Sequence, residues 1–215
     1  MSGAEGVTVD TAVEWPSPEQ FSAADTIVFF QKGRWNAERA LAIDAHLAQG
    51  HGLVYIHWAM EGGSKAPEFA QRIGLASNSK QTKYRHGPLD LTFPSQRLDS
   101  GEHHPIGRNL DTVHFYDESY WQLLGDPSRV RIIATGIEDS QSCPLFWTIE
   151  PSIADTQQHD AKQPGRVFAS VLGHYSWTFD DPLFRILLLR GTAWSVHEPV
   201  DRFNELATLG VKFAD

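Results

Sequence analysis

Two short apolar runs separated by a helical pattern open the regular part of the chain. Residues 26–30 and 53–56 are continuous apolar runs, as expected of strands that are buried on both faces. The helix predicted between them has an N-cap at Asn36, a left-handed stop at Gly50 and a buried stripe at helical spacing. That stripe consists of Ala40, Ile43 and Leu47. The pattern predicts parallel strands joined by a helical crossover.

The second half of the chain continues the alternation. Further strands are predicted over three ranges, namely 129–135, 145–147 and 166–172, with the middle one the shortest. Asp181 followed by Pro182 predicts a cap with proline in the first turn of a long helix, which continues to the neighbourhood of Gly191. A second helix is predicted from near Pro199.

The middle and the start of the chain depart from this alternation. Leu89, Leu91 and Phe93 alternate with polar residues, which predicts a half-exposed strand in an antiparallel excursion over residues 81–117. Residues 6–10 form a short polar run that is typical of an edge strand rather than of the central strand that opens a doubly wound sheet. We therefore hypothesise that the first strand-helix unit is missing.

Composition limits the classes of partner. The 215 residues, 41% of them hydrophobic, are enough for one sizeable core, and no repeat or long linker divides them, so one domain over 1–215 is predicted. A net charge of -9 disfavours nucleic acid and anionic membranes as partners. No apolar run approaches the roughly 20 residues of a membrane span, so we expect a soluble chain, with the cytoplasm favoured. A homo-oligomer is left open.

Three polar residues follow apolar runs at the strand ends where open α/β sheets bind ligands. His57 follows the run over 53–56, and it can serve as a general base or metal ligand, or be an ordinary histidine bonded to a backbone carbonyl. His174 follows Gly173 and can act in the same way, or be a turn histidine. Glu118 is either the acid of the site or part of an acidic helix N-terminus.

Aromatic residues beside these positions suggest a surface for a sugar. Trp58, Tyr175 and Trp177 are predicted to form a flat platform for a sugar ring. His86, next to an arginine in a predicted turn, can face a carboxylate or a hydroxyl-rich ligand, although a solvated loop is slightly favoured.

Other chemistry finds little support. Cys143 precedes a predicted strand and lacks the glycine-flanked elbow of a nucleophile. Residues 62–65 lack the spacing of a phosphate loop, so no cofactor-binding motif is predicted. His104 is predicted to anchor the turn before Ile106. No metal-binding spacing exists, so the identity of any metal stays unknown, and a divalent metal would need ligands from separate strands.

A series of motifs in a fixed order resembles the ThuA-like family of trehalose-utilisation proteins. The motifs are the residues at 52–59, 104–106, 117–120, 144–147, 165–168, 172–174, 181–185 and 191–194. The resemblance implies a flavodoxin-like open parallel sheet with helices on both faces, of the class I glutamine amidotransferase-like type, without that superfamily's cysteine nucleophile. It places His57, Glu118 and His174 on recurring polar positions of the family, and His86 on a histidine of a closer subgroup.

The leading hypothesis is therefore an enzyme of carbohydrate catabolism that acts through a His/Glu site on a disaccharide, such as trehalose or its keto derivative. Hydrolysis and proton abstraction beside a carbonyl both suit imidazole and carboxylate groups. The alternative is a non-catalytic module of the same fold that binds a sugar or a partner. The N-terminus departs from the family pattern, because it lacks the apolar strand and the loop with glycine and histidine.

Overall fold

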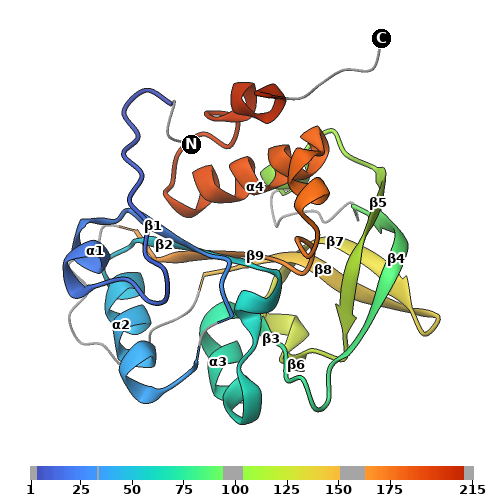
Figure 1. Ribbon diagram of the computed structural model, residues 1–215, viewed down its shortest axis with the longest axis horizontal. Coiled ribbons are helices and arrows are strands. Elements are labelled where there is room, and N and C mark those ends of the chain that lie inside the picture. The colour runs from blue at the N-terminus through green and yellow to red at the C-terminus, as the bar shows by residue number, and fades with distance from the viewer. Residues whose placement is uncertain (1–3, 33, 94–103, 151–162, 211–215) are drawn as a thin grey trace.

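A mixed seven-stranded sheet forms the centre of the molecule (Figure 1). The computed structural model describes residues 4–32, 34–93, 104–150 and 163–210. The strand order is β1-β2-β9-β8-β7-β4-β5. Their bounds are β1 Thr26–Phe29, β2 Gly52–Ile56, β4 Lys83–Thr92, β5 Thr112–Trp121, β7 Arg131–Glu138, β8 Gln141–Ile149 and β9 Arg166–Ser170. The fold is therefore mixed α/β, as the alternation in the sequence predicted at the coarse level.

Only half of the sheet is parallel. Strands β1, β2 and β9 pair in parallel, whereas β8, β7, β4 and β5 extend the sheet by antiparallel pairing. Between β7 and β8 the chain turns through Asp139 and Ser140, both with positive φ (48° and 61°), as in the tight turns that join hairpin strands. Two strands joined by only two residues must run antiparallel. The prediction of an open parallel sheet was therefore wrong for the half that contains β7 and β8. In Figure 1 the sheet curls, and β4 and β5 rise steeply at its far edge, beyond β7 and β8.

Helices cover both faces of the parallel half. Helices α2 (Ala37–Ala48) and α3 (Ala66–Ile73) lie on one face, and α4 (Pro182–Ser195) lies on the other (Figure 1). The predicted caps are confirmed, because Asn36 accepts from the Arg39 amide and Asp181 accepts from two amides of the first turn. Gly191 lies inside α4 rather than near its end. A glycine is needed at this position because a Cβ there would meet the Phe168 ring at 2.2 Å.

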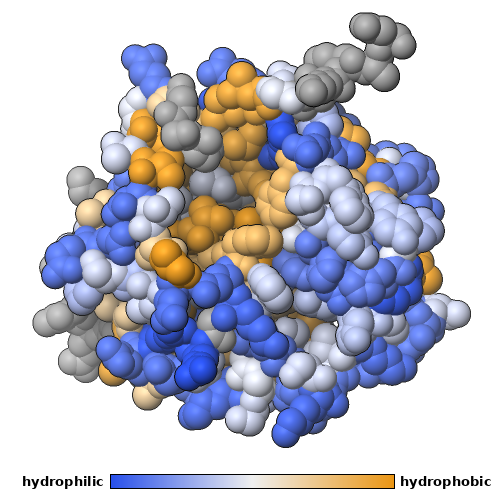
Figure 2. Space-filling view, viewed as in Figure 1, coloured by the Kyte–Doolittle hydropathy of each residue, from blue (hydrophilic) through white to orange (hydrophobic). Residues whose placement is uncertain are grey.

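Short elements complete the chain. They are α1 Pro18–Ala23, the two-stranded sheet of β3 Leu75–Ala76 with β6 Leu124–Gly125, and single 3-10 turns. The turns are η1 His57–Met60, η2 Gly63–Lys65, η3 Pro105–Gly107, η4 Pro127–Arg129, η5 Ser176–Asp180 and η6 Asn204–Thr208. In Figure 2 the surface over α2 and α3 is largely hydrophilic, whereas apolar residues gather around α4. Within the described ranges, no helix has the length and apolar character needed to cross a membrane.

Three sequence predictions at the periphery were wrong. Residues 7–10 form no strand. β1 is not buried on both faces, since it lies at the sheet edge and Val28 is 49% exposed. The helix predicted near Pro199 is replaced by turns and η6, in which backbone bonds join residues three apart, such as the Asn204 N–H with the Asp201 carbonyl at 3.1 Å.

The antiparallel excursion in the middle of the chain is confirmed. β4 pairs with β5 along ten residues, and the predicted inward residues Leu89 and Leu91 are 5% and 0% exposed. The strand predicted at 145–147 is also present, but it is part of the longer β8. This hairpin of β4 and β5 brings the middle of the chain across to the carboxyl ends of β2 and β9, where the polar residues gather.

Candidate functional site

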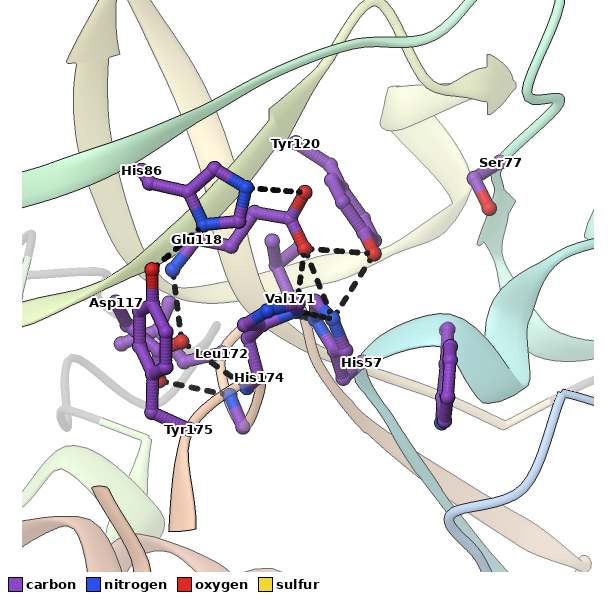
Figure 3. Close-up of polar contacts among 12 residues, drawn as sticks. His57, Ser77, His86, Asp117, Glu118, Tyr120, Val171, Leu172, His174 and Tyr175 are labelled. Carbon is purple, nitrogen blue, oxygen red and sulfur yellow. Dashed lines mark hydrogen bonds and ion pairs between the residues drawn. The ribbon is translucent and has the colours of Figure 1, made fainter. Parts of the chain in front are cut away.

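Side chains from β2, β4, β5 and the loop after β9 form one polar cluster (Figure 3). The cluster consists of His57, His86, Glu118, Tyr120 and His174. It lies beyond the carboxyl ends of two parallel strands, which is where open α/β sheets place ligands. The structure therefore brings together His57, Glu118, His174 and His86, which the sequence proposed separately.

His57 is held in a fixed orientation at the end of β2. It has a positive φ of 56° and begins the 3-10 turn η1, so the chain bends sharply there. Its ring is buried, and Nδ1 lies 2.8 Å from the Val171 carbonyl oxygen. Because a carbonyl only accepts, Nδ1 carries the proton and donates, which leaves Nε2 directed at the cluster. The carbonyl bond expected of an ordinary histidine is present, but it occupies only one ring nitrogen.

Three groups surround the free nitrogen of His57. Its Nε2 lies 3.1 Å from Glu118 Oε2, 3.1 Å from His174 Nδ1 and 3.0 Å from the Tyr120 hydroxyl. Glu118 Oε2 also lies 2.9 Å from His174 Nδ1 and 3.2 Å from the Tyr120 hydroxyl. Glu118 and Tyr120 reach the same side because residues two apart in a strand share a face.

Glu118 belongs to a strand, so its interpretation as part of a helix N-terminus was wrong. It lies in the middle of β5 and is 6% exposed. Burial raises the pKa of this carboxyl, but the proximity of His57, His174 and His86 lowers the pKa by more, for a net decrease. The carboxylate is therefore ionised at neutral pH. Burial first, and then the Glu118 charge, raise the pKa of Tyr120, so its hydroxyl stays protonated.

Asp117 fixes the loop that carries His174. Its two carboxylate oxygens accept from the backbone N–H groups of Gly173, at 2.9 Å, and of His174, at 3.0 Å, and the side chain is fully buried. In the sequence Asp117 is only the neighbour of Glu118, and no local signal indicates that its side chain reaches the loop 56 residues further along.

His86 lies in β4, so the predicted turn at this point was wrong. It pairs with Glu118 across the ladder, with its Nε2 at 3.5 Å from Glu118 Oε1. Its Nδ1 lies 2.9 Å from the Tyr175 hydroxyl. With 39% of its side chain exposed, His86 lies at the boundary between the cluster and solvent.

The aromatic residues of the predicted platform form two separate surfaces. Tyr175 and Trp177 stack on each other at 4.1 Å between ring centroids, and Trp177 is 54% exposed. Trp58 lies on the other side of His57, with its indole nitrogen donating to the Phe30 carbonyl. Tyr175 covers one face of the Trp177 ring by stacking. The opposite face of Trp177 is the one that a ligand can contact.

The remaining candidates lie apart from the cluster. His104 accepts from the Ile106 amide, as predicted for a turn anchor, and burial lowers its pKa to about 4. Cys143 lies in β8 opposite Gly136, and burial raises the pKa of its thiol, which disfavours the thiolate.

A recess separate from the cluster lies between β1 and α2. Its lining includes Trp15, Trp35 and Tyr55, with Glu14 and Arg34 at its polar side. The Tyr55 hydroxyl and the Trp35 indole nitrogen are buried there without a hydrogen-bond partner among the described residues. None of the cluster's histidines lines this recess.

The cluster can perform acid-base chemistry and can also hold a metal. His57 presents a lone pair, Glu118 an ionised carboxylate and Tyr120 a protonated hydroxyl, which together supply a base and a donor. His57, Glu118 and His174 each offer one ligand atom, and these atoms all lie within 4.8 Å of one another. They come from separate strands and loops, as the sequence required of any metal site.

Comparison with known proteins gives one family and several similar structures. Residues 1–195 match the family described as ThuA, trehalose utilisation. A ThuA-like protein of Parabacteroides merdae is 22% identical with a TM-score of 0.61, covering 82% of this chain and 71% of that one. Another from Bacteroides uniformis is 15% identical with a TM-score of 0.57, covering 81% of this chain and 71% of that one. No curated protein sequence matches the chain.

Proposed function

We propose a specific enzymatic activity on a disaccharide for this chain, which belongs to the ThuA family of trehalose utilisation. Family membership supports a role in carbohydrate metabolism, and the polar cluster supports catalysis. The single observation that carries the proposal is the contact of His57 Nε2 with Glu118 Oε2, at 3.1 Å, and with the Tyr120 hydroxyl, at 3.0 Å. An imidazole lone pair beside a carboxylate and a protonated hydroxyl is an arrangement suited to moving protons on a substrate.

The chemistry of the cluster favours the keto form of a disaccharide. A hydrogen next to a carbonyl is acidic enough for an imidazole base such as His57, whereas the hydrogens of an unmodified sugar are not. The Tyr120 hydroxyl stays protonated because its pKa is raised, so it can donate a hydrogen bond to the oxygen that becomes negative. Trehalose oxidised to a keto sugar is therefore the first substrate to test.

The aromatic surface supports a sugar as the ligand. Trp177 is 54% exposed and Tyr175 links its ring to His86 through a hydroxyl contact of 2.9 Å. An exposed indole face stacks on the apolar face of a sugar ring, while histidine and carboxylate groups bond its hydroxyls. Tyr175 stacks on Trp177 and contacts His86 of the cluster, so the exposed face of Trp177 lies near the cluster. One ligand can therefore contact both the Trp177 ring and the cluster.

The proposal is tested by measuring turnover of trehalose and of 3-ketotrehalose by the wild type and by His57→Ala. We expect the wild type to convert the keto sugar and the variant to lose at least about 100-fold in kcat/KM. His114→Ala is the matched control, since His114 also pairs with a carboxylate, Asp90, but lies on the exposed outer part of β5.

Two outcomes separate the proposal from its alternative. Equal rates in the wild type and His57→Ala would contradict it. Calorimetric binding of the sugars without turnover by the wild type would instead support a non-catalytic binding module. Because His57 is buried, His174→Ala, at a more exposed position, is measured beside it to separate loss of function from loss of folding.

A further inference from the structure

We propose that His57, Glu118 and His174 bind one divalent transition-metal ion through Nε2, Oε2 and Nδ1. The inference rests on the proposed function because it uses the same side chains, and it changes one role, since His57 Nε2 would be a ligand rather than the base when the ion is bound. It is carried by the triangle that the three atoms form, whose edges measure 3.1, 3.1 and 2.9 Å.

Hydrogen bonding alone does not account for these contacts. Five short contacts join His57 Nε2, His174 Nδ1, Glu118 Oε2 and the Tyr120 hydroxyl. With neutral imidazoles, the His57 proton is on Nδ1 and points at Val171, so two protons are available, one on His174 Nδ1 and one on Tyr120, and protonation of His57 adds only a third for the five contacts. The remaining contacts bring lone pairs together, as between His57 Nε2 and Glu118 Oε2 at 3.1 Å.

A metal ion removes this shortage. It accepts one lone pair from each corner of the triangle, so that all three edges become distances between ligands. The Tyr120 hydroxyl then donates its single proton to Glu118 Oε2, at 3.2 Å. The ion thereby accounts for the three edges of the triangle and the Tyr120 proton for the contact with Glu118 Oε2, while the Tyr120 hydroxyl stays a neighbour of His57 Nε2 at 3.0 Å.

The size of the triangle fits one face of an octahedral ion. Nitrogen and oxygen ligands bind first-row divalent ions at about 2.1 Å, so two ligands at right angles lie about 3.0 Å apart. The observed edges of 3.1, 3.1 and 2.9 Å match that spacing on all three sides.

His57 is oriented as metal-binding histidines are, and His174 is held through its backbone. A metal-binding histidine usually donates its other ring N–H to a carbonyl or carboxylate, which fixes the tautomer. His57 does so with the Val171 carbonyl at 2.8 Å. The backbone of His174 is fixed by the buried Asp117 carboxylate at 3.0 Å, which limits how far its ring can move.

The donor set indicates the class of ion. Two imidazoles and one carboxylate suit Zn²⁺, Fe²⁺, Mn²⁺ or Co²⁺, whereas Ca²⁺ and Mg²⁺ prefer oxygen ligands. Three ligands on one face leave further positions open, and the side chains of His174 and His86 are 36% and 39% exposed at the solvent side. A keto sugar with a neighbouring hydroxyl presents two oxygens that could occupy such positions together.

The ion is tested on the intact chain without any sugar. Chelator-treated protein is titrated with Zn²⁺ by calorimetry and with Co²⁺ by visible absorption. We expect one ion per chain, with a dissociation constant below about 10 µM, and an affinity at least about 100-fold weaker in His174→Ala and in Glu118→Gln. His114→Ala, which alters an exposed pair of histidine and carboxylate outside the cluster, is expected to bind like the wild type.

The outcomes distinguish this inference from the proposed function. Absence of stoichiometric binding by the wild type, or equal affinities in wild type and His174→Ala, would overturn the metal. Absence of stoichiometric binding together with full turnover of 3-ketotrehalose would overturn the metal while the proposed function would stand. Tight binding that depends on the three side chains, without sugar turnover, would support the metal and contradict the proposed function.

Discussion

The Asp117 carboxylate holds the backbone of His174, since Asp117 Oδ1 lies 3.0 Å from the His174 amide nitrogen. The other oxygen, Oδ2, accepts from Gly173 at 2.9 Å. In Figure 3 this carboxylate lies beside the backbone of His174 and away from the Glu118 oxygens. Asp117 is thus a positioning residue, which acts on the site through the loop that carries His174.

Asp117→Asn is expected to impair both stability and turnover. The amide keeps one acceptor but directs an NH2 group at a backbone N–H, so a buried donor loses its partner at a cost of about 1–3 kcal/mol in the free energy of unfolding. A mobile His174 should lower kcat more than it raises KM. Urea unfolding and steady-state kinetics measure the two effects, and an unchanged kcat in a folded variant would contradict the positioning role.

Tyr120→Phe is expected to lower kcat while leaving the fold intact. The ring stacks on His57 at 4.8 Å and phenylalanine keeps this stacking, so only the hydroxyl donor is removed. Loss of one positioned donor should reduce kcat by about 100-fold. Tyr84→Phe is the control, because Tyr84 is opposite Tyr120 in the ladder but 62% exposed. Equal kcat values for the two variants would contradict a role for the Tyr120 hydroxyl.

Acidification is expected to destabilise the fold through two buried histidines. Burial lowers the pKa of His46 and of His104 to about 4 from the model-compound value of 6.5. Between these values the unfolded chain binds more protons than the folded one, so stability falls as the pH drops from about 6.5 to about 4 and levels off below. Each residue contributes on the order of 3 kcal/mol.

Urea unfolding between pH 7 and pH 4 measures this dependence. His104→Gln should be less stable than the wild type at pH 7 because it loses the ring contacts to Ile106 and Thr148, yet its stability should fall less on acidification. Parallel curves for the wild type and the variant across this range would show that His104 does not cause the loss.

Two buried aromatic residues are expected to respond in opposite ways to losing their polar atom. The Tyr55 hydroxyl is buried without a partner among the described residues, so Tyr55→Phe should be neutral or stabilising. The Trp147 indole nitrogen donates to the Ile73 carbonyl at 2.7 Å, so Trp147→Phe should cost at least about 2 kcal/mol through the lost bond and the cavity. A destabilised Tyr55→Phe would show that the hydroxyl has a partner after all.

The parallel half of the fold was predictable because its signals are local. Apolar runs, the caps at Asn36 and Asp181, and helical spacing all lie within a few residues of the elements they specify. The antiparallel half depends on the tight turn at Asp139 and Ser140, which lacks the usual asparagine-glycine pair and therefore gave no clear hairpin signal.

The site was predictable in its residues but not in its arrangement. Strand-end positions were enough to select His57 and His174, which lie 117 residues apart. Glu118 remained ambiguous because an acidic pair before aromatic residues is equally typical of a helix start. Tyr120 was missed, although its position two residues after Glu118 places both on one face of a strand.

The most direct test of the central claim is the kcat/KM of Glu118→Gln with 3-ketotrehalose, measured beside the wild type and His114→Ala. Glutamine keeps the shape of the side chain and removes the charge that His57 and His174 contact at 3.1 and 2.9 Å. The account predicts a loss of at least about 100-fold for Glu118→Gln and none for His114→Ala. Equal values for Glu118→Gln and the wild type, in folded proteins, would contradict it.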